Sequence, residues 1–315
     1  MKITYVQHAN IDIEKWDYCI ESAANGLIYA YSYYLDAMSK NWDALVMNDY
    51  EAVMPLTWNR KLGISYLRQP AFTQQLGIFG NLLITEKIVN EFTNKASELF
   101  PFAEINLNYA NENIDTGNKK CNLVLDLNNP FIEIEKSFKK DLIKNIKKAK
   151  RSHLIYEATE EIETAIESYI RAYSARFHTS EKDYPDFLQL CFLLKSKGQI
   201  FVRKVTSKNK QLLAIAIFLK DRKRIYNIMS TTFPEGRNRE ANHFLLYQLI
   251  KEFSEHHLIL DFEGSEIPSI QSFYKKFGAI EQPYPFVKIN KLPFGIKWIK
   301  SIYDYLKPGY KESGR

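Results

Sequence analysis

Cysteine is scarce in this chain of 315 residues: Cys19, Cys121 and Cys191 are far apart in the sequence. Their number is odd, and none has the CxxC or Cys/His spacing typical of metal ligands. Small secreted domains rely on paired cysteines, and zinc sites on closely spaced ones. The pattern therefore predicts neither a disulfide framework nor a metal site, and it favours a reducing compartment.

Long apolar runs are missing too. The first residues, MKITYVQHANIDIEKWDYC, contain no apolar stretch of signal-peptide length. No other window approaches the ~20 apolar residues that a helix needs to cross a bilayer. We therefore expect a soluble, cytoplasmic protein.

Several catalytic motifs are absent as well, among them GxSxG, HExxH, the Walker A sequence and GxGxxG. Their absence argues against a nucleophile-elbow hydrolase, a zinc protease, a P-loop protein and a Rossmann dehydrogenase. None of the six histidines stands in a recognisable nucleophile motif. His178 follows a predicted helix, where it is either a helix C-terminal cation or a residue that faces a cleft.

The composition is that of an ordinary folded protein. Hydrophobic residues make up 45% of the chain, charged residues 25% and aromatic residues 14%, which argues against disorder as the main state. The formal net charge is +6, and much of it lies in residues 136–151. A chain of this length exceeds one typical core and suits two domains.

Strand and helix signals follow a similar order in both halves of the chain. In the first half, apolar runs at 42–47 and 51–58 flank an Asn48-Asp49 turn, a helical pattern spans 87–99, and a strand is predicted at 121–127. The second half is predicted to contain, in order, helices at 160–178 and 186–196, strands at 199–205, 211–219 and 224–232, a helix at 242–255, a strand at 258–262, a helix at 270–277 and a strand at 285–289. This order predicts mixed α/β sheets covered by helices and, because the hairpins at 42–58 and 199–231 correspond, a diverged duplication. An amphipathic closing helix is predicted at 295–307.

One segment of the second half carries a family resemblance. DFEGS at 261–265 and SIQSFYKKFGA at 269–279 resemble a segment of the GNAT acyltransferases and, over its full length, of the Fem-type peptidoglycan aminoacyltransferases. The basic stretch SFKKDLIKNIKKAKRS at 137–152 is similar to a segment at the domain junction of the Fem-type, or FemAB-like, group. The resemblance implies two tandem GNAT-like domains: residues 1–135, a basic junction helix at 136–152, and residues 153–315, which carry the donor site.

The chemistry that the resemblance implies is transfer of an acyl group from an activated donor to an amine. Tyr274 stands where GNAT enzymes often carry a tyrosine general acid, and a phenol with a pKa of ~10 is protonated at neutral pH. Asp261 or Glu263, at the end of the strand, could accept the proton of the amine. The structural alternatives are that Tyr274 only packs beside Phe273 and that Asp261 caps the following turn.

The residue after Phe273 bears on the donor. Fem-type enzymes that use aminoacyl-tRNA carry Lys at this position, whereas thioester-using GNAT enzymes carry Tyr, as this chain does. The resemblance therefore favours acyl-CoA or an acyl carrier over aminoacyl-tRNA as the donor, with no permanently bound cofactor.

A degenerate phosphate loop is predicted between the strand at 224–232 and the next helix. GNAT enzymes hold pyrophosphate there with free backbone N–H groups and the helix dipole. Glu240 departs from the family pattern and places a negative charge near the phosphates, so a solvated helix start is the alternative. The predicted donor-binding residues are Arg237, Asn238, Arg239, Ala241, Asn242, Ser230 and Thr231.

Two further groups of residues are predicted to bind substrate. In the basic helix, Phe138, Leu142, Ile146 and Ala149 form one apolar face, which leaves Lys144, Lys147 and Lys148 for phosphates or for solvent. In the N-terminal half, a polar and aromatic cluster is expected to contact the acceptor, the alternative being a loop packed on a sheet edge. Its members are Tyr66, Arg68, Gln69, Gln74 and Gln75.

Together these features predict an N-acyltransferase. Its partners would be an acyl donor and an amine-bearing small molecule or cell-wall precursor, with tRNA a less favoured partner. The alternative is a non-catalytic GNAT-like binding or scaffold protein whose basic helix binds an anionic partner or a nucleic acid.

Overall fold

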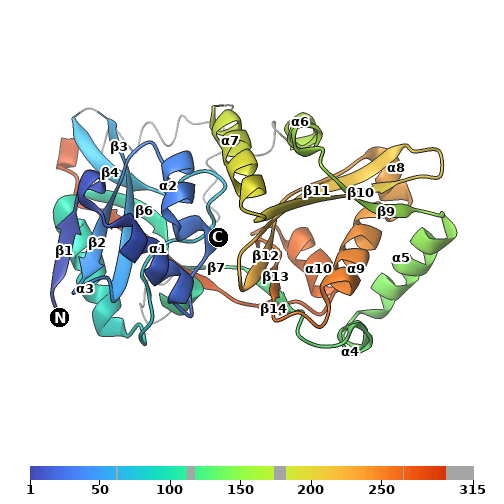
Figure 1. Cartoon of the computed structure of the whole chain (residues 1–315), viewed down its shortest axis with the longest axis horizontal. Coiled ribbons are helices and arrows are strands. Elements are labelled where there is room, and N and C mark those ends of the chain that lie inside the picture. The colour runs from blue at the N-terminus through green and yellow to red at the C-terminus, as the bar shows by residue number, and fades with distance from the viewer. Residues whose placement is uncertain (62, 112–117, 174–181, 265, 296–315) are drawn as a thin grey trace.

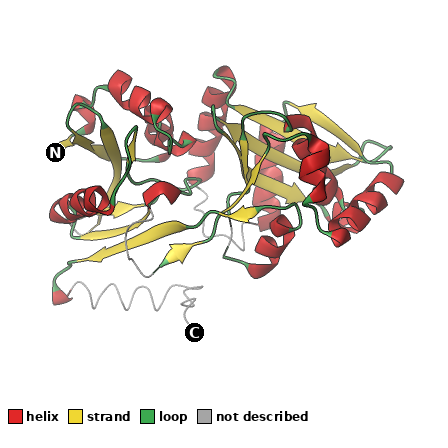
Figure 2. Ribbon diagram, turned by 90° about the horizontal axis from the view of Figure 1, so that it is seen from below, coloured by secondary structure: helices red, strands yellow, loops and turns green. Residues whose placement is uncertain are grey.

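The computed structural model describes the whole chain except residues 62, 112–117, 174–181, 265 and 296–315. Within the described residues the strands form two sheets, which lie on the left and right of Figure 1. Seen from below, in Figure 2, the strands of the two sheets form separate groups with helices packed on them. The expectation of a mixed α/β fold with two sheets is confirmed.

The first sheet follows the order β1-β2-β3-β4-β6-β15-β7, with β5 paired to β3. Its strands are β1 (Ile3–Val6), β2 (Trp42–Met47), β3 (Ala52–Lys61), β4 (Ile64–Arg68), β5 (Phe79–Gly80), β6 (Phe102–Asn106), β7 (Lys119–Lys120) and β15 (Tyr284–Asn290). The predicted hairpin at 42–58 is the antiparallel pair β2–β3. Strand β4 runs parallel to β6, after the crossover through α3 (Glu86–Leu99).

The second sheet follows the order β14-β8-β13-β12-β11-β10-β9. Its strands are β8 (Leu123–Asp126), β9 (Ile155–Thr159), β10 (Ile200–Thr206), β11 (Leu212–Lys220), β12 (Arg224–Thr232), β13 (Ile259–Asp261) and β14 (Ile280–Glu281). Strands β10, β11 and β12 are antiparallel neighbours, as the repeated hairpin pattern predicts. Strand β12 runs parallel to β13, after the crossover through α9 (Ala241–Phe253).

The two sheets have the same topology. Read from β1 and from β9, each has antiparallel strands, then one parallel pair joined by a helix, then an antiparallel strand. The strand after the parallel pair comes from the other half of the chain: β15 lies beside β6, and β8 lies beside β13. Neither sheet is therefore built from one continuous stretch. The division by residue number at 135 and 152 stays a prediction.

Helices complete both parts. The N-terminal part contains η1 (His8–Asn10), α1 (Ile13–Ser22), η2 (Ile28–Ala30), α2 (Ser32–Met38), α3 and η3 (Tyr109–Asn111). The C-terminal part contains α4 (Phe131–Lys136), α5 (Lys140–Arg151), α6 (Ile162–Tyr173), α7 (Asp183–Ser196), α8 (Pro234–Asn238), α9 and α10 (Pro268–Lys275). The predicted helix at 295–307 lies almost wholly outside the described residues, and His178 lies outside them as well.

Periodic apolar residues explain why the crossover helices lie on the sheets. The α3 helix begins after Thr85, whose side chain accepts a hydrogen bond from the backbone of Ile88, and it buries Ile88, Val89, Phe92 and Ala96. Helix α9 is apolar over most of its surface and packs between the sheet and α5. Burial of one large aliphatic side chain contributes about 1.5–3 kcal/mol to folding.

The basic junction segment was predicted as one helix over residues 136–152, but α4 ends at Lys136 and the helix α5 spans only Lys140–Arg151. Its buried residues are Leu142, Ile146 and Ala149, and Phe138 is buried just before its first turn. The apolar face expected from the sequence is therefore confirmed. Among the described residues, no helix has both the length and the apolar character needed to cross a bilayer.

Candidate active site

The site lies where β12 and β13 separate. These parallel strands pair at three positions only, of which the last joins Tyr226 to Asp261. β12 then continues to Thr232, and within the described residues no strand pairs with it on this edge beyond Tyr226. The edge of β12 beyond Tyr226 is therefore not paired with a described strand, and we refer to this unpaired edge, where the two parallel strands separate, as the opening. Ligand sites in α/β sheets commonly lie beyond the carboxyl ends of parallel strands.

An irregularity in β12 occurs at the start of this opening. Ile217 pairs with Met229 and Leu219 pairs with Tyr226, so β12 has one residue more than β11 over this interval. Such a bulge redirects side chains and is often found beside an active site. Here the bulged interval contains Asn227, a buried polar residue between the apolar residues Tyr226 and Ile228.

Tyr274 lies on α10 and reaches this opening. Its ring stacks on Phe262, with ring centroids 4.6 Å apart. The side-chain amide of Asn227 donates a hydrogen bond to the Tyr274 hydroxyl at 3.4 Å. Burial raises the pKa of Tyr274 well above its usual value, and the nearby Glu263 carboxylate adds to the effect. The phenol is therefore protonated at neutral pH.

Glu263 lies in the turn that follows β13. Its φ of 60° and the φ of 35° at Gly264 place two successive residues in the left-handed region, which is strained for glutamate. Among the described residues, the buried Oε1 of Glu263 has no hydrogen-bond partner. Burial raises the pKa of Glu263 to about 8. A carboxyl group with such a pKa can exchange a proton near neutral pH.

Asp261 has a different environment. It is 1% exposed, and its Oδ2 accepts hydrogen bonds from Arg224 at 2.9 Å and from Asn122 at 3.1 Å. Its Oδ1 accepts the backbone N–H of Glu263 at 2.9 Å. Both oxygens are thus engaged, and one of them forms the turn cap that was the structural alternative. The geometry supports positioning of the Glu263 turn.

The predicted phosphate loop is occupied by internal ion pairs. Glu240 has a φ of 60° and precedes α9. Its carboxylate lies 2.8 Å from the Lys148 ammonium and 3.0 Å from His243 Nδ1. Arg239 pairs with Glu235 at 2.8 Å, and Arg237 donates to the carbonyl of Thr232 at 2.8 Å. The cations that the sequence assigned to phosphate therefore already have partners.

The other predicted donor residues surround the same loop. Ser230 donates a hydrogen bond to the side chain of Asn242 at 3.5 Å. The Thr231 hydroxyl is buried and has no partner among the described residues. Asn238 is exposed at the end of α8, and Ala241 is buried at the start of α9. These residues therefore lie around one loop, between the end of β12 and the start of α9.

The N-terminal cluster divides into two groups. Gln69 and Gln75 hold the local backbone, because their side-chain oxygens accept the N–H groups of Asn106 and Tyr109. Tyr66 packs against Phe102, and Arg68 is exposed on β4. Gln74 alone is connected to the site. Its amide donates to the side chain of Asn122 at 3.4 Å, and Asn122 bonds to Asp261.

The three predicted lysines lie on the exposed face of α5, where Lys144 and Lys147 project to solvent and Lys148 pairs with Glu240. Sequence reasoning missed Asn227, Arg224 and Asn122, which connect the site across three strands. A polar residue inside the run IYNIM at 225–229 was the available signal for Asn227. Among the described residues, no group of three His, Cys, Asp or Glu side chains is placed to hold a metal ion.

Comparisons with known proteins agree with this geometry. Residues 136–275 match the family model of the acetyltransferase (GNAT) domain. A search of curated protein sequences gives no significant match. The fold is similar to that of FemX, at 14% identity and a TM-score of 0.65, with 97% of this chain and 100% of FemX covered.

Two other solved structures have similar folds. A tandem GNAT protein from the clavulanic acid biosynthesis pathway is 11% identical, with a TM-score of 0.55 over 93% of this chain and 99% of that protein. A conserved protein of unknown function from Bacteroides thetaiotaomicron is 8% identical, with a TM-score of 0.58 over 92% of this chain and 100% of that protein. The domain match supports N-acyl transfer in general. Residues 136–275 therefore match a GNAT domain, and the whole fold is similar to those of FemX and of the tandem GNAT protein.

Proposed function

We propose that this protein is an N-acyltransferase whose reaction takes place at the opening between β12 and β13. The observation that carries the proposal is the position of Tyr274, Asn227 and Glu263 around this opening. A protonated phenol and a carboxyl group with a raised pKa are the acid and base that acyl transfer to an amine requires. The domain boundaries near residues 135 and 152 are part of the proposal.

In this reaction the amine nitrogen attacks the carbonyl carbon of the activated donor. A C–N bond forms, and the C–S or C–O bond to the leaving group breaks. Glu263, in its carboxylate form, accepts the proton that the amine loses. Tyr274 gives its proton to the leaving thiolate or alkoxide. Unpaired N–H groups of β12 beyond Tyr226 are suited to stabilise the carbonyl oxygen as negative charge develops.

Asp261 has a positioning role in this scheme. Its bond to the backbone of Glu263 holds the left-handed turn, and its ion pair with Arg224 keeps the carboxylate from turning toward substrate. The same group connects through Asn122 to Gln74 of the N-terminal part. An amine acceptor held between the two parts would therefore contact residues that also support the base.

The donor that we favour is acyl-CoA or an acyl carrier. Its support is Tyr274 in the place of the lysine of tRNA-dependent Fem-type enzymes. Phosphates of such a donor would meet Glu240 at the start of α9, where they would compete for Lys148. Substrate contacts by Lys144, Lys147 and the loop from Arg237 to Asn242 belong to this proposal. An amine-bearing small molecule or a cell-wall precursor is the proposed acceptor.

The test is a donor panel with the purified full chain. Acetyl-CoA, longer acyl-CoA, an acyl carrier protein and aminoacyl-tRNA are each titrated while the melting temperature is recorded, because a ligand of the native state raises it. Release of free thiol in the presence of a panel of amines then measures transfer. Stabilisation by a thioester donor together with amine-dependent thiol release is the expected result. Stabilisation by aminoacyl-tRNA alone would contradict the donor assignment.

Glu240 gives the donor test a second arm. If phosphates bind at the α9 N-terminus, Glu240→Gln should tighten CoA binding by roughly two- to tenfold, because a repelling charge at the helix start is removed and Lys148 is released. Glu98→Gln, which removes an exposed carboxylate that pairs with Lys95 on α3, far from this loop in the sequence, is the control and should leave CoA affinity unchanged. Equal CoA affinity in Glu240→Gln and the original chain would place the donor phosphates elsewhere.

Glu240 also favours a second candidate, a non-catalytic binding protein. The Glu240 carboxylate is fixed at the position where phosphate is expected. We would expect such a change in a protein that had lost donor binding. In this case no donor stabilises the chain, and an anionic partner binds α5 instead. The donor panel separates the two candidates, since only the first predicts thiol release.

A further inference from the structure

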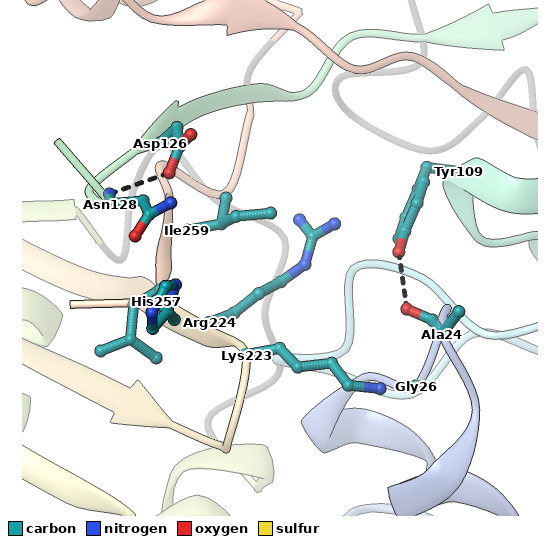
Figure 3. Close-up of a pocket in the computed structure, with 10 residues that line it drawn as sticks. Ala24, Gly26, Tyr109, Asp126, Asn128, Lys223, Arg224, His257 and Ile259 are labelled. Carbon is teal, nitrogen blue, oxygen red and sulfur yellow. Dashed lines mark hydrogen bonds between the residues drawn. The ribbon is translucent and has the colours of Figure 1, made fainter.

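A pocket that Tyr274 does not line is formed by residues from both parts of the molecule (Figure 3). Its volume is about 310 Å³. One wall is formed by Ala24 and Gly26, after α1, together with Tyr109 of η3. The opposite wall is formed by the turn between β11 and β12 and by the start of β13. Small-molecule sites are often found at such domain junctions.

Arg224 is the central polar residue of this pocket. It is 2% exposed, its Nη1 donates to Asp261 at 2.9 Å, and its guanidinium lies 4.5 Å from the centroid of the Tyr109 ring. The other terminal nitrogen, Nη2, is buried and has no hydrogen-bond partner among the described residues. Figure 3 shows the guanidinium extending into the space between Ile259 and Tyr109. A buried donor without an acceptor costs free energy, which a bound acceptor would recover.

Lys223 lies beside Arg224 on the same wall. It is half-buried, and its ammonium group donates to the carbonyl of Ala23. Burial lowers the pKa of Lys223, and Arg224 and Arg222 lower it further, whereas Asp221 raises it. Three cations thus follow one another in this turn. Arg222 pairs with Glu21 at 2.8 Å on the outside, but Lys223 has no carboxylate within ion-pair distance among the described residues.

The remaining charged groups at the pocket are exposed. Asp126 uses one carboxylate oxygen to accept the backbone N–H of Asn128 at 2.9 Å. His257 is exposed on the rim. The buried Arg224 and the half-buried Lys223 are thus less exposed than Asp126, the acidic residue among the described lining residues, an arrangement that suits an anion of limited size.

We propose that this pocket binds a small oxyanion, a carboxylate or a phosphate group, through Nη2 of Arg224 and the ammonium group of Lys223. The site is separate from the acyl-transfer site of the proposed function and does not depend on it. The two are connected, because Arg224 bonds to Asp261, which bonds to the backbone of Glu263. A bound anion would therefore stabilise the ion pair that holds the Glu263 turn.

The experiment is a titration of the purified full chain with three probes: inorganic phosphate, acetate and the amino acid alanine. Ionic strength is kept constant with sodium chloride, and binding is followed by calorimetry and by the melting temperature. The expected result is saturable binding of at least one probe. Phosphate alone would indicate a phosphate site, and acetate or alanine a carboxylate site. Absence of saturable binding for all three would overturn the proposal.

Variants identify the pocket as the place of binding. Lys223→Gln removes the buried cation and should weaken binding about tenfold or more, since a charge-assisted hydrogen bond is removed. Arg222→Gln is the matched control, because it removes a neighbouring cation that pairs outside the pocket, and it should bind like the original chain. Melting temperatures without anion verify that both variants fold. Equal weakening in both variants, or in neither, would contradict the proposed site.

Discussion

Two glutamates follow neighbouring parallel strands of the second sheet and adopt the same backbone conformation. Glu240 after β12 and Glu263 after β13 both have a φ of 60°. The carboxylate of Glu240 is held by Lys148 and His243, at 2.8 and 3.0 Å. Glu263 has a buried oxygen without a partner among the described residues, and its pKa is raised to about 8.

The elements packed against each turn explain this difference. Helix α5 brings Lys148 to Glu240, and α9 contributes His243 one turn later. The groups near Glu263 are the aromatic pair Phe262 and Tyr274 and the neutral amide of Asn227. Burial without a cationic partner among the described residues raises the pKa of the Glu263 carboxyl group, whereas Glu240 has the Lys148 ammonium 2.8 Å away. The comparison teaches that the neighbouring groups, and not the backbone conformation, distinguish the ion-paired Glu240 from Glu263, the general base that we propose.

The largest effect that we expect is on turnover, in Glu263→Gln. Loss of a general base lowers the rate by ~100- to 10,000-fold. Steady-state kinetics with the donor and acceptor identified by the panel provide the measurement. Glu266→Gln, in the same loop, is the control and should retain its rate. If Glu263→Gln turns over normally while Glu240→Gln does not, our interpretation of the two glutamates is reversed.

Tyr274→Phe should lower turnover by ~100- to 10,000-fold as well, because the leaving group loses its proton donor. Loss of its one weak hydrogen bond should cost only about 1 kcal/mol of stability. Tyr247→Phe is the matched control: its hydroxyl also forms a hydrogen bond, to Glu135 at 2.8 Å, but on the far side of α9. Rates and melting temperatures are recorded for both variants. A normal rate in Tyr274→Phe would leave this residue a packing role.

The next effect concerns stability and pH. Because the folded-state pKa of Glu263 is raised from 4.5 to about 8, its contribution to stability is complete below the unfolded pKa and is lost as the pH rises through about 8. Glu263→Gln removes this pH-dependent loss of stability. The melting temperature of the variant, compared with that of the original chain at the same pH, should therefore rise as the pH increases from about 5 to about 9.

Glu240→Gln tests the other side of the comparison. It loses two partners whose charges change little above neutral pH, since burial lowers the pKa of His243. Its destabilisation should therefore be similar at pH values of about 7 and 9. Melting curves of both variants over this range provide the measurement. A pH-independent difference for Glu263→Gln would mean that Glu263 is not a buried titrating group.

The smallest effect is expected from the exposed face of α5. If this face binds a phosphate-bearing donor, the double variant Lys144→Gln/Lys147→Gln should bind that donor more weakly. The slope of log affinity against log salt concentration should also become smaller in magnitude, by roughly 0.7–0.9 for each phosphate that a lysine no longer neutralises. The donor is the one identified by the panel. Lys136→Gln, which removes a cation that pairs with Glu133, is the control. An unchanged salt slope would make the lysines of α5 purely structural.

Local signals in the sequence predicted much of the architecture. The turn at Asn48-Asp49 predicted the β2–β3 hairpin, and the 3.6-residue spacing of apolar residues predicted α3, α5 and α9. Such signals depend on neighbours within a few residues, so they survive without knowledge of the fold. The segment SFYKKFGA placed Tyr274 on a helix after a buried strand, which the structure shows as α10 after β13.

The sequence did not predict that each half of the chain contributes a strand to the sheet of the other half. Both β8 and β15 look like ordinary short strands, and nothing local distinguishes a partner in the same half from one in the other half. β15 pairs with β6 about 180–190 residues earlier, and β8 pairs with β13 about 135 residues later. Strand pairing depends on which edge is available once the rest has folded, which is a non-local property.

What the sequence by itself determined is therefore the set of elements, their duplicated order and the resemblance of residues 136–275 to the GNAT domain. Tertiary structure alone decided the roles of the acidic residues. Asp261, Glu240 and Glu263 all follow or precede regular elements and are equally acidic in the sequence, yet Arg224 pairs with the first, Lys148 with the second, and no described cation with the third. The pKa of a carboxyl group depends on burial and on charges a few ångströms away, and these are set by packing between segments distant in the chain.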